Sequence, residues 1–318
     1  MKKFFLLAFT VAAVIFLGAQ SDLNFNGDAN EFADVKTEKP LKKSDAANWW
    51  ETETLTVEGH GKARADEKNI GQARILAKRA ALMDGYRNLA KATGQVQITA
   101  KDTLSEEKID VLIKGATILS ETYDANGNCT VVLSVPIYGV TNSFAKAALE
   151  PVDKKNFPAP KSEVAAKGNY TGLIIDCGDL ELNPVLAPEL RDEKNQSVYG
   201  YENLDYEKVI AKGMIGYVEK RRINFSDEEI VRLLKSGGTK NHFAQVGSKI
   251  FFAAADGNLT RAGSNPLIIK ATGLSEDNSC PVISEEDADK ILSENLSSHF
   301  LDEGAVVFTS NRIRGMRM

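Results

Sequence analysis

The pattern of apolar and polar residues predicts one long helix over residues 70–92, between segments with the two-residue period of strands. Its small and apolar residues fall largely on one side, namely Ile70, Ala73, Leu76, Ala77, Ala80, Ala81, Met83, Leu89 and Ala90. The other side carries Lys78, Arg79, Asp84, Arg87 and Lys91. Because alanine allows a helix axis to approach closely, and a sheet with an apolar face needs a cover, we expect this helix to cover a sheet.

The segments around this helix supply the strands. Residues 54–57 alternate as a half-buried strand does, and Gly59 and Gly61 then end it as turn and packing glycines. Residues 118–123 and 129–138 flank an Asn-Gly turn and predict a hairpin. Shorter elements complete this region: a strand over 96–100, a helix capped by Ser105 and running to 114, and a helix within 141–149.

Three prolines between residues 151 and 160 mark a boundary, after which a second set of elements begins. Strands are predicted over 171–177, 213–218, 267–271 and 305–308, and a hairpin is predicted from arms at 185–190 and 197–201. Helices start after Ser226 and Ser284, and residues 243–255 fit either a helix or a strand. The last strand–helix–strand run is long enough for a parallel crossover, and the basic tail from Arg312 is expected to fray.

These elements predict an α+β fold with two small domains, the first a sheet covered by a long Ala-rich helix. The predicted organisation is a signal peptide over 1–20, a flexible spacer over 21–48, a first domain over 49–150, a Pro/Lys linker over 151–168 and a second α+β domain over 169–318.

The amino terminus predicts export. Lys2 and Lys3 precede an uncharged run over residues 4–19, which is the layout of a secretory signal. The run is short for a membrane span, which needs about 20 residues. Cleavage after Ala19 and an uncleaved amino-terminal anchor both remain open, and membrane contact is expected only with the anchor. We therefore expect a location in the periplasm or the outer cell envelope.

Charge and cysteine content narrow the partners. The formal net charge of -5 provides no basic footprint for phosphate, so nucleic acid is not expected as a partner. Three cysteines are too few for a disulfide framework or a zinc site. Export permits one disulfide, for which Cys177 and Cys280 are the candidates, and buried free thiols are the alternative.

Catalytic motifs are weak or missing. The three histidines stand at no metal-ligand spacing, so no metal or cofactor is expected. An incomplete calcium-loop pattern begins at Asp22 but has Ala33 where a glutamate is needed. The S-x-x-K match at Ser105 and the Lys235-Ser236-Gly237 tripeptide lack a partner S-D-N motif. We predict no catalytic residues, although a carboxylate pair assembled by the fold would be invisible at this level.

Several segments resemble a known family. Residues 57–61, the Ala-rich helix and the hairpin arm with Val131, Leu133 and Val135 resemble the Lpp-twenty lipoprotein family and the related amino-terminal domain of flagellar assembly protein T. Residues 170–176, 183–188, 197–200 and 261–271 are similar to the extension of longer members. The resemblance implies an envelope protein with an α+β domain and no known catalytic set. Two departures are the missing lipobox cysteine and an apparent insertion over 221–258.

Together these observations predict an exported structural or interaction protein of the cell envelope that assists a flagellar or other envelope assembly and has envelope proteins as partners. The contact surface would be an exposed sheet edge or hairpin. The alternative is an extracytoplasmic hydrolase acting on cell-wall or glycan substrates, which would need a concave pocket with convergent acidic groups.

Overall fold

The computed structural model describes residues 48–64, 69–161, 166–219, 242–245, 250–253 and 261–315. The predicted signal peptide and nearly all of the spacer lie outside these residues. So do the helix expected after Ser226 and most of the proposed insertion over 221–258. The chain is α+β, and residues 42–318 form one compact unit by their contacts. The division into two domains at 151–168 stays a prediction, and the two sets of elements are called the first and second halves below.

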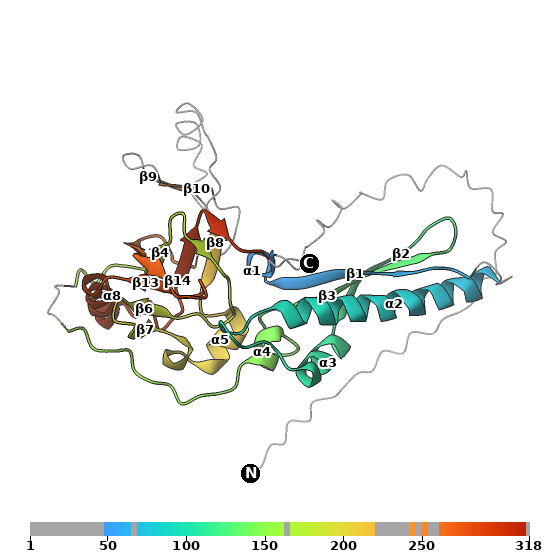
Figure 1. The fold of residues 1–318 in the computed structure, drawn as a ribbon, viewed down its shortest axis with the longest axis horizontal. Helices are drawn as coiled ribbons and strands as arrows, with labels where there is room; N and C mark the ends of the chain where they lie inside the picture. The colour runs from blue at the N-terminus through green and yellow to red at the C-terminus, as the bar shows by residue number, and fades with distance from the viewer. Residues whose placement is uncertain are drawn as a thin grey trace, which may run out of the picture. The chain divides into compact units, whose positions relative to one another are not determined.

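The first half is a three-stranded antiparallel sheet covered by one long helix (Figure 1). The strands are β1 (Thr54–Gly61), β2 (Thr117–Tyr123) and β3 (Cys129–Pro136), in the order β1-β3-β2. The helices are α1 (Trp49–Thr52), α2 (Ile70–Gln95), α3 (Glu106–Lys114) and α4 (Phe144–Ala148). The predicted cover of a sheet by an Ala-rich helix is thereby confirmed.

Helix α2 buries a narrower ridge than its sequence suggests. The buried positions recur every four residues and are Ala73, Ala77, Ala81, Gly85, Leu89 and Thr93, with Ala92 beside them. Ile70, Ala80 and Met83, which were expected on the buried side, are exposed. Leu82, Tyr86 and Ala90, next to the ridge, are partly buried against the core, and only the apolar residues further round the helix lie in solvent.

Gly59 and Gly61 lie inside β1 and pair regularly with Val131 and Cys129, so the expected turn is wrong. Their role is in packing. A Cβ atom on Gly61 would lie 1.9 Å from the Ala77 carbonyl oxygen, and one on Gly59 would lie 2.2 Å from that of Ala81. Glycine is required here because the backbones of strand and helix are in direct contact.

Other details of the first half differ from expectation. The predicted strand over 96–100 is only a single bridge between Gln97 and Thr103. Ser105 occupies the N-cap position of α3, but its side chain makes no capping hydrogen bond. The hairpin β2–β3 is present as predicted, and Asp124 Oδ1 accepts bonds from the backbone N–H groups of Asn126 and Asn128 in its turn.

The second half is built on a four-stranded parallel sheet in the order β11-β4-β14-β8. Its strands are β4 (Gly172–Asp176), β8 (Gly216–Glu219), β11 (Pro266–Lys270) and β14 (Val306–Ser310). Helix α8 (Glu285–Ser298) connects the parallel strands β11 and β14, which confirms the predicted parallel crossover. Ser284 Oγ accepts a bond from the Asp287 N–H and caps α8 as expected.

Smaller elements surround this sheet. A second sheet has the order β12-β13-β6-β7, formed by β6 (Leu190–Asp192), β7 (Ser197–Tyr199), β12 (Gly273–Leu274) and β13 (Pro281–Ile283). The first arm of the predicted hairpin is therefore β6 rather than 185–190. The remaining elements are β5 (Glu181–Leu182), a 3-10 turn (Tyr201–Asn203), α5 (Tyr206–Lys212), β9 (His242–Gln245), β10 (Ile250–Ala253) and β15 (Arg312–Ile313). The tail pairs with the rest of the chain through β15 and β5, so the prediction that it frays is wrong for residues 312–315.

The predicted linker is held against the second half rather than free of it. The Lys155 N–H donates to the Glu202 carbonyl at 2.7 Å, and Phe157 stacks on Tyr199 with ring centroids 6.2 Å apart. Further along, the Lys167 and Gly168 N–H groups donate to the buried carboxylate of Glu294 at 2.8 and 2.9 Å. These bonds fix the path of the connector over the elements that it joins.

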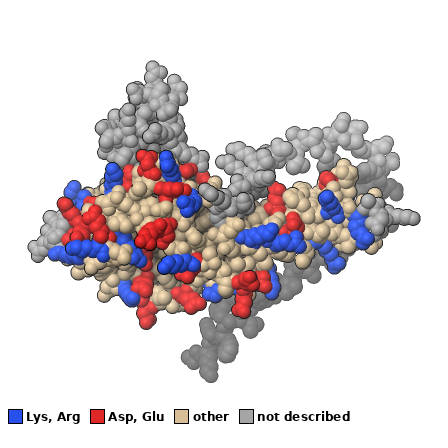
Figure 2. Space-filling model, in the orientation of Figure 1, with Lys and Arg blue, Asp and Glu red and all other residues tan. Residues whose placement is uncertain are grey.

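Charge is distributed unevenly over the two halves. Helix α2 carries five basic residues and one acidic residue, and blue side chains lie along it in Figure 2. Helix α8 instead begins with Glu285, Glu286 and Asp287. The negative net charge of the whole chain therefore hides a basic element.

Candidate functional site

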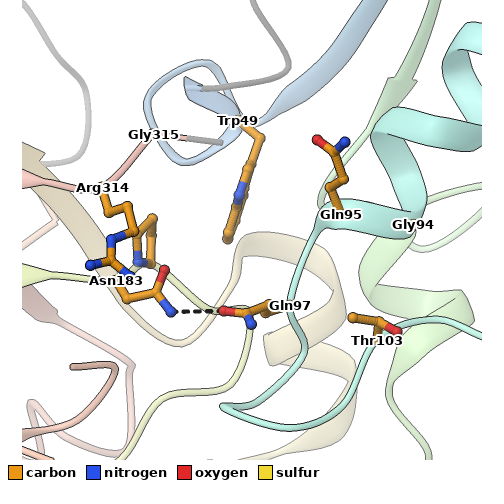
Figure 3. A pocket seen from close by; sticks show the side chains of 9 residues that line it. Trp49, Gly94, Gln95, Gln97, Thr103, Asn183, Arg314 and Gly315 are labelled. Carbon is orange, nitrogen blue, oxygen red and sulfur yellow. Dashed lines mark hydrogen bonds between the residues drawn. The ribbon is translucent and has the colours of Figure 1, made fainter. Parts of the chain in front are cut away.

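A pocket of about 510 Å³ opens beside the first turn of the described chain (Figure 3). Trp49 comes from α1, Gly94 and Gln95 from the end of α2, and the bridged pair Gln97 and Thr103 from the following loop. The second half contributes the segments that follow β5 and β15, namely Asn183, Pro184, Arg314 and Gly315. The pocket volume is in the usual range for small-molecule sites.

Hydrogen bonds hold the polar lining in place. Asn183 Nδ2 donates to Gln97 Oε1 at 2.7 Å, the bond drawn as a dashed line in Figure 3. The backbone carbonyl of Gln97 also accepts from the Leu186 N–H at 2.9 Å. Arg314 Nε donates to Glu181 Oε1 at 3.1 Å, so the guanidinium is held by a carboxylate that is not part of the pocket lining.

The chemistry of this pocket suits binding rather than acid–base catalysis. Among the described residues, its lining contains amides, one hydroxyl, one guanidinium and one indole, with no Asp, Glu, His or Cys. A glycoside hydrolase of the usual kind needs two carboxyl groups facing its substrate. The convergent acidic groups that the hydrolase hypothesis requires are not in this lining.

The outer strand β2 is the second candidate site. Among the described strands it pairs with β3 alone, and six of its seven residues are exposed. Ile118 and Leu119 are 44% and 45% exposed, although each is a large apolar residue. The register with β3 shifts between Ile118 and Ser120, so Leu119 lies at an irregularity of the strand. An edge strand with exposed apolar residues can pair with a further extended segment.

Polar contacts tie the far end of β2 to α2. Lys78 Nζ lies 2.6 Å from Glu121 Oε2, and this hydrogen bond lowers the pKa of Glu121. Tyr123 Oη donates to Glu121 Oε1 at 2.8 Å, which raises the pKa of Tyr123 to about 12. The Arg74 guanidinium lies 5.6 Å from the centroid of the Tyr123 ring. These contacts hold β2 in place while its outer edge remains available.

No disulfide joins the candidate cysteines Cys177 and Cys280 in the structure, which agrees with the alternative of unpaired thiols, and the disulfide stays an untested candidate. Cys177 is buried at the end of β4, where its N–H donates to the Thr309 carbonyl. The Cys280 sulfur accepts a bond from the Glu189 N–H at 3.4 Å and contacts Ser279 Oγ at 3.3 Å. Both thiols lie close enough to the buried Tyr217 for their charge to affect its pKa.

Sequence reasoning missed the pocket because neutral amides form no recognisable spacing. Gln97 and Asn183 are 86 positions apart and meet only through the contact of the two halves. Trp49 and Trp50 are both buried, and nothing in the tryptophan pair itself marks Trp49 as a pocket wall. Within the described residues, no three His, Cys, Asp or Glu side chains gather as a metal site, and no described helix is long and apolar enough to cross a membrane.

Comparison with known families gives a match to the half that contains the parallel sheet. Residues 172–312 match the family model for the second domain of Treponema pallidum Tp0624. This chain is therefore similar to that domain over less than half of its length. No curated protein matches the chain. The match to the Tp0624 domain runs from β4 to β15 and includes Asn183 of the pocket, but it does not reach β2 or α2.

Proposed function

We propose that this chain is an exported interaction protein of the cell envelope, and that β2 is the strand with which it engages a partner protein. The single observation that carries this proposal is the exposed, one-sided pairing of β2. Export is supported by the amino-terminal signal pattern, and an envelope role by the resemblance to the Lpp-twenty family. A flagellar or other envelope assembly is the proposed setting.

The energetic argument concerns both the backbone and the side chains of β2. An added strand gains backbone hydrogen bonds along the unpaired edge, while the side chains on either face provide specificity. Burying Ile118 and Leu119 would add apolar contact at the centre of such an interface. Native edge strands are commonly protected by charge, by bulges or by covering chain, and in β2 the charge of Glu121 and the register shift leave Ile118 and Leu119 as the exposed apolar part of the edge.

The test is site-specific photocrosslinking in living cells that express the full chain. A photoreactive residue in place of Leu119 is expected to give discrete adducts with an envelope protein, which mass spectrometry identifies. The double substitution Ile118→Lys and Leu119→Lys should abolish co-purification of that protein, because charged side chains cannot be buried in the new strand pair.

The matched control is Val111→Lys on α3, where an equally apolar residue is 69% exposed. This variant should retain the partner, and circular dichroism of both variants should match the parent. Partner recovery that is unchanged by the β2 double substitution would contradict a role of β2. Recovery of the chain from the cytoplasm alone would contradict the envelope assignment.

A further inference from the structure

The solvent-facing side of α2 has an unusual composition. A ridge of residues with a period of four runs along it, offset by two positions from the buried ridge, and consists of Ile75, Arg79, Met83, Arg87 and Lys91. All five are exposed, and the two large apolar members are 61% and 64% exposed. We refer to these five residues as the outer ridge.

The outer ridge is basic on a protein with a negative net charge. Its three charged members are all positive, and the single acidic residue of α2 is Asp84. Asp84 lies beside the ridge and contacts Arg87 Nη1 at 3.4 Å, while its Oδ2 accepts from the His60 N–H at 3.0 Å. Other basic residues of α2 are already engaged, because Lys78 pairs with Glu121 and Arg74 lies over Tyr123.

Figure 2 shows Lys and Arg side chains along α2, with tan surface between them. Exposed Met and Ile side chains separated by cations have no evident function in the fold itself, because the opposite ridge already supplies the packing against the sheet. A helix face that combines large apolar groups with Lys and Arg is suited to the boundary between anionic headgroups and acyl chains.

We propose that the outer ridge of α2 binds an anionic lipid surface, with Ile75 and Met83 inserted among the acyl chains and Arg79, Arg87 and Lys91 placed at the headgroup phosphates. The occupant follows from charge complementarity together with the apolar residues, since an acidic protein surface would satisfy the cations alone. This inference goes beyond the proposed function, because it concerns a different surface and does not depend on pairing of β2.

The first arm of the test measures cosedimentation of the full chain with vesicles of phosphatidylcholine, with and without phosphatidylglycerol. Binding should increase with the anionic fraction and decrease with salt, because attraction to surface charge is screened within about 8 Å at physiological ionic strength. Reversal of the ridge charge by Arg79→Glu, Arg87→Glu and Lys91→Glu should weaken binding to anionic vesicles at least about tenfold.

Matched variants separate the ridge from other causes of binding. Lys101→Glu, Lys114→Glu and Lys270→Glu make the same change of net charge at exposed positions elsewhere, and this triple variant should bind nearly as the parent does. Vesicle binding through the apolar run at the amino terminus would be the same in every variant, so it cannot explain a difference between them. Ile75→Ser with Met83→Ser should weaken binding, whereas Val111→Ser with Leu296→Ser, equally exposed elsewhere, should not.

Three results would overturn the proposal. The first is equal binding of anionic vesicles by the parent and the charge-reversed ridge variant. The second is an equal loss in the ridge variant and its charge control. The third is a lack of vesicle binding together with binding of another occupant to the outer ridge. That occupant would be soluble polyglutamate, or a second copy of the chain detected by sedimentation velocity. Failure of these tests would leave the crosslinking test of β2 unaffected, so the two proposals fail separately.

Discussion

Single glycines determine how closely α2 lies on the sheet. Gly59 and Gly61 in β1 face the carbonyl groups of Ala81 and Ala77, and Gly85 in α2 faces the Leu133 side chain, whose Cδ1 would lie 2.9 Å from an added Cβ. A helix-interior glycine costs roughly 1 kcal/mol relative to alanine, so the position of Gly85 is explained by packing and not by propensity. Three glycines in two elements thus form one contact.

Substitution Gly61→Ala tests this contact. The added methyl group meets backbone atoms that cannot rotate away, so the helix must move outward from β1. We expect a loss in the free energy of unfolding of about 3 kcal/mol, at the upper end of the range for overpacking, measured by urea denaturation. Gly273→Ala, where nothing lies within 4 Å of the new Cβ, should change stability by less than about 0.5 kcal/mol. Equal losses of stability in the two variants would show that the close approach of α2 to β1 does not determine the effect of Gly61→Ala.

Helix α8 organises the connector as well as the parallel sheet. Its buried Asp289 accepts a bond from the Lys161 N–H at 2.9 Å, and its buried Glu294 accepts the two N–H groups of Lys167 and Gly168. Buried carboxylates that receive backbone donors in this way act as fixed anchors. A segment that reads as a flexible linker therefore has a defined path along one helix.

Removing one anchor should release the connector. Glu294→Ala leaves the Lys167 and Gly168 N–H groups without their acceptor, and because both residues are exposed, water can take the place of the carboxylate. We expect faster hydrogen exchange of these two amides, while exchange in β4 and β14 stays slow. Leu296→Ala on the exposed side of the same helix is the control. Unchanged exchange at residues 167 and 168 would contradict the anchoring role.

At the scale of the whole molecule, the two halves meet through backbone hydrogen bonds. The Leu186 and Ala187 N–H groups donate to the Gln97 and Ile98 carbonyls at 2.9 and 2.8 Å, and the Gly139 N–H donates to the Ile210 carbonyl at 2.7 Å. The half-buried Glu53 lies where its charge interacts with Arg261 of the second half. Burial raises the pKa of Glu53 above its usual 4.5, and Arg261 offsets part of that shift.

This raised pKa predicts how stability depends on pH. Because the folded protein holds the Glu53 proton more tightly than the unfolded chain does, the contribution of this group is complete below pH 4.5 and is lost as pH rises through the folded pKa. The free energy of unfolding of Glu53→Gln, relative to that of the parent, should therefore be higher at pH 7 than at pH 4. Urea denaturation at the two pH values measures this difference. The exposed Glu276→Gln serves as the control. A Glu53→Gln effect that is the same at both pH values would contradict the prediction.

The sequence and the structure agree best where the signal is local. The period of α2, the Asn-Gly hairpin and the Ser284 cap each depend on neighbouring residues, and each element formed as expected. The sequence-based predictions and the structure differ where a contact between distant residues determines the local conformation. Gly59 and Gly61 were predicted as turn residues, but they lie in a strand against which α2 packs. The tail from Arg312 was predicted to fray, but β15 pairs with β5.

The sequence by itself determined the α+β class and the cover of a sheet by an Ala-rich helix, because hydrophobic periodicity and turn chemistry act over a few residues. Only the tertiary structure decided which ridge of α2 is buried, that β2 is an outer strand of its sheet, and that Gln97 and Asn183 share a pocket. These features depend on which distant segments come together, and that pairing is set by the summed packing of the core rather than by any one stretch of chain.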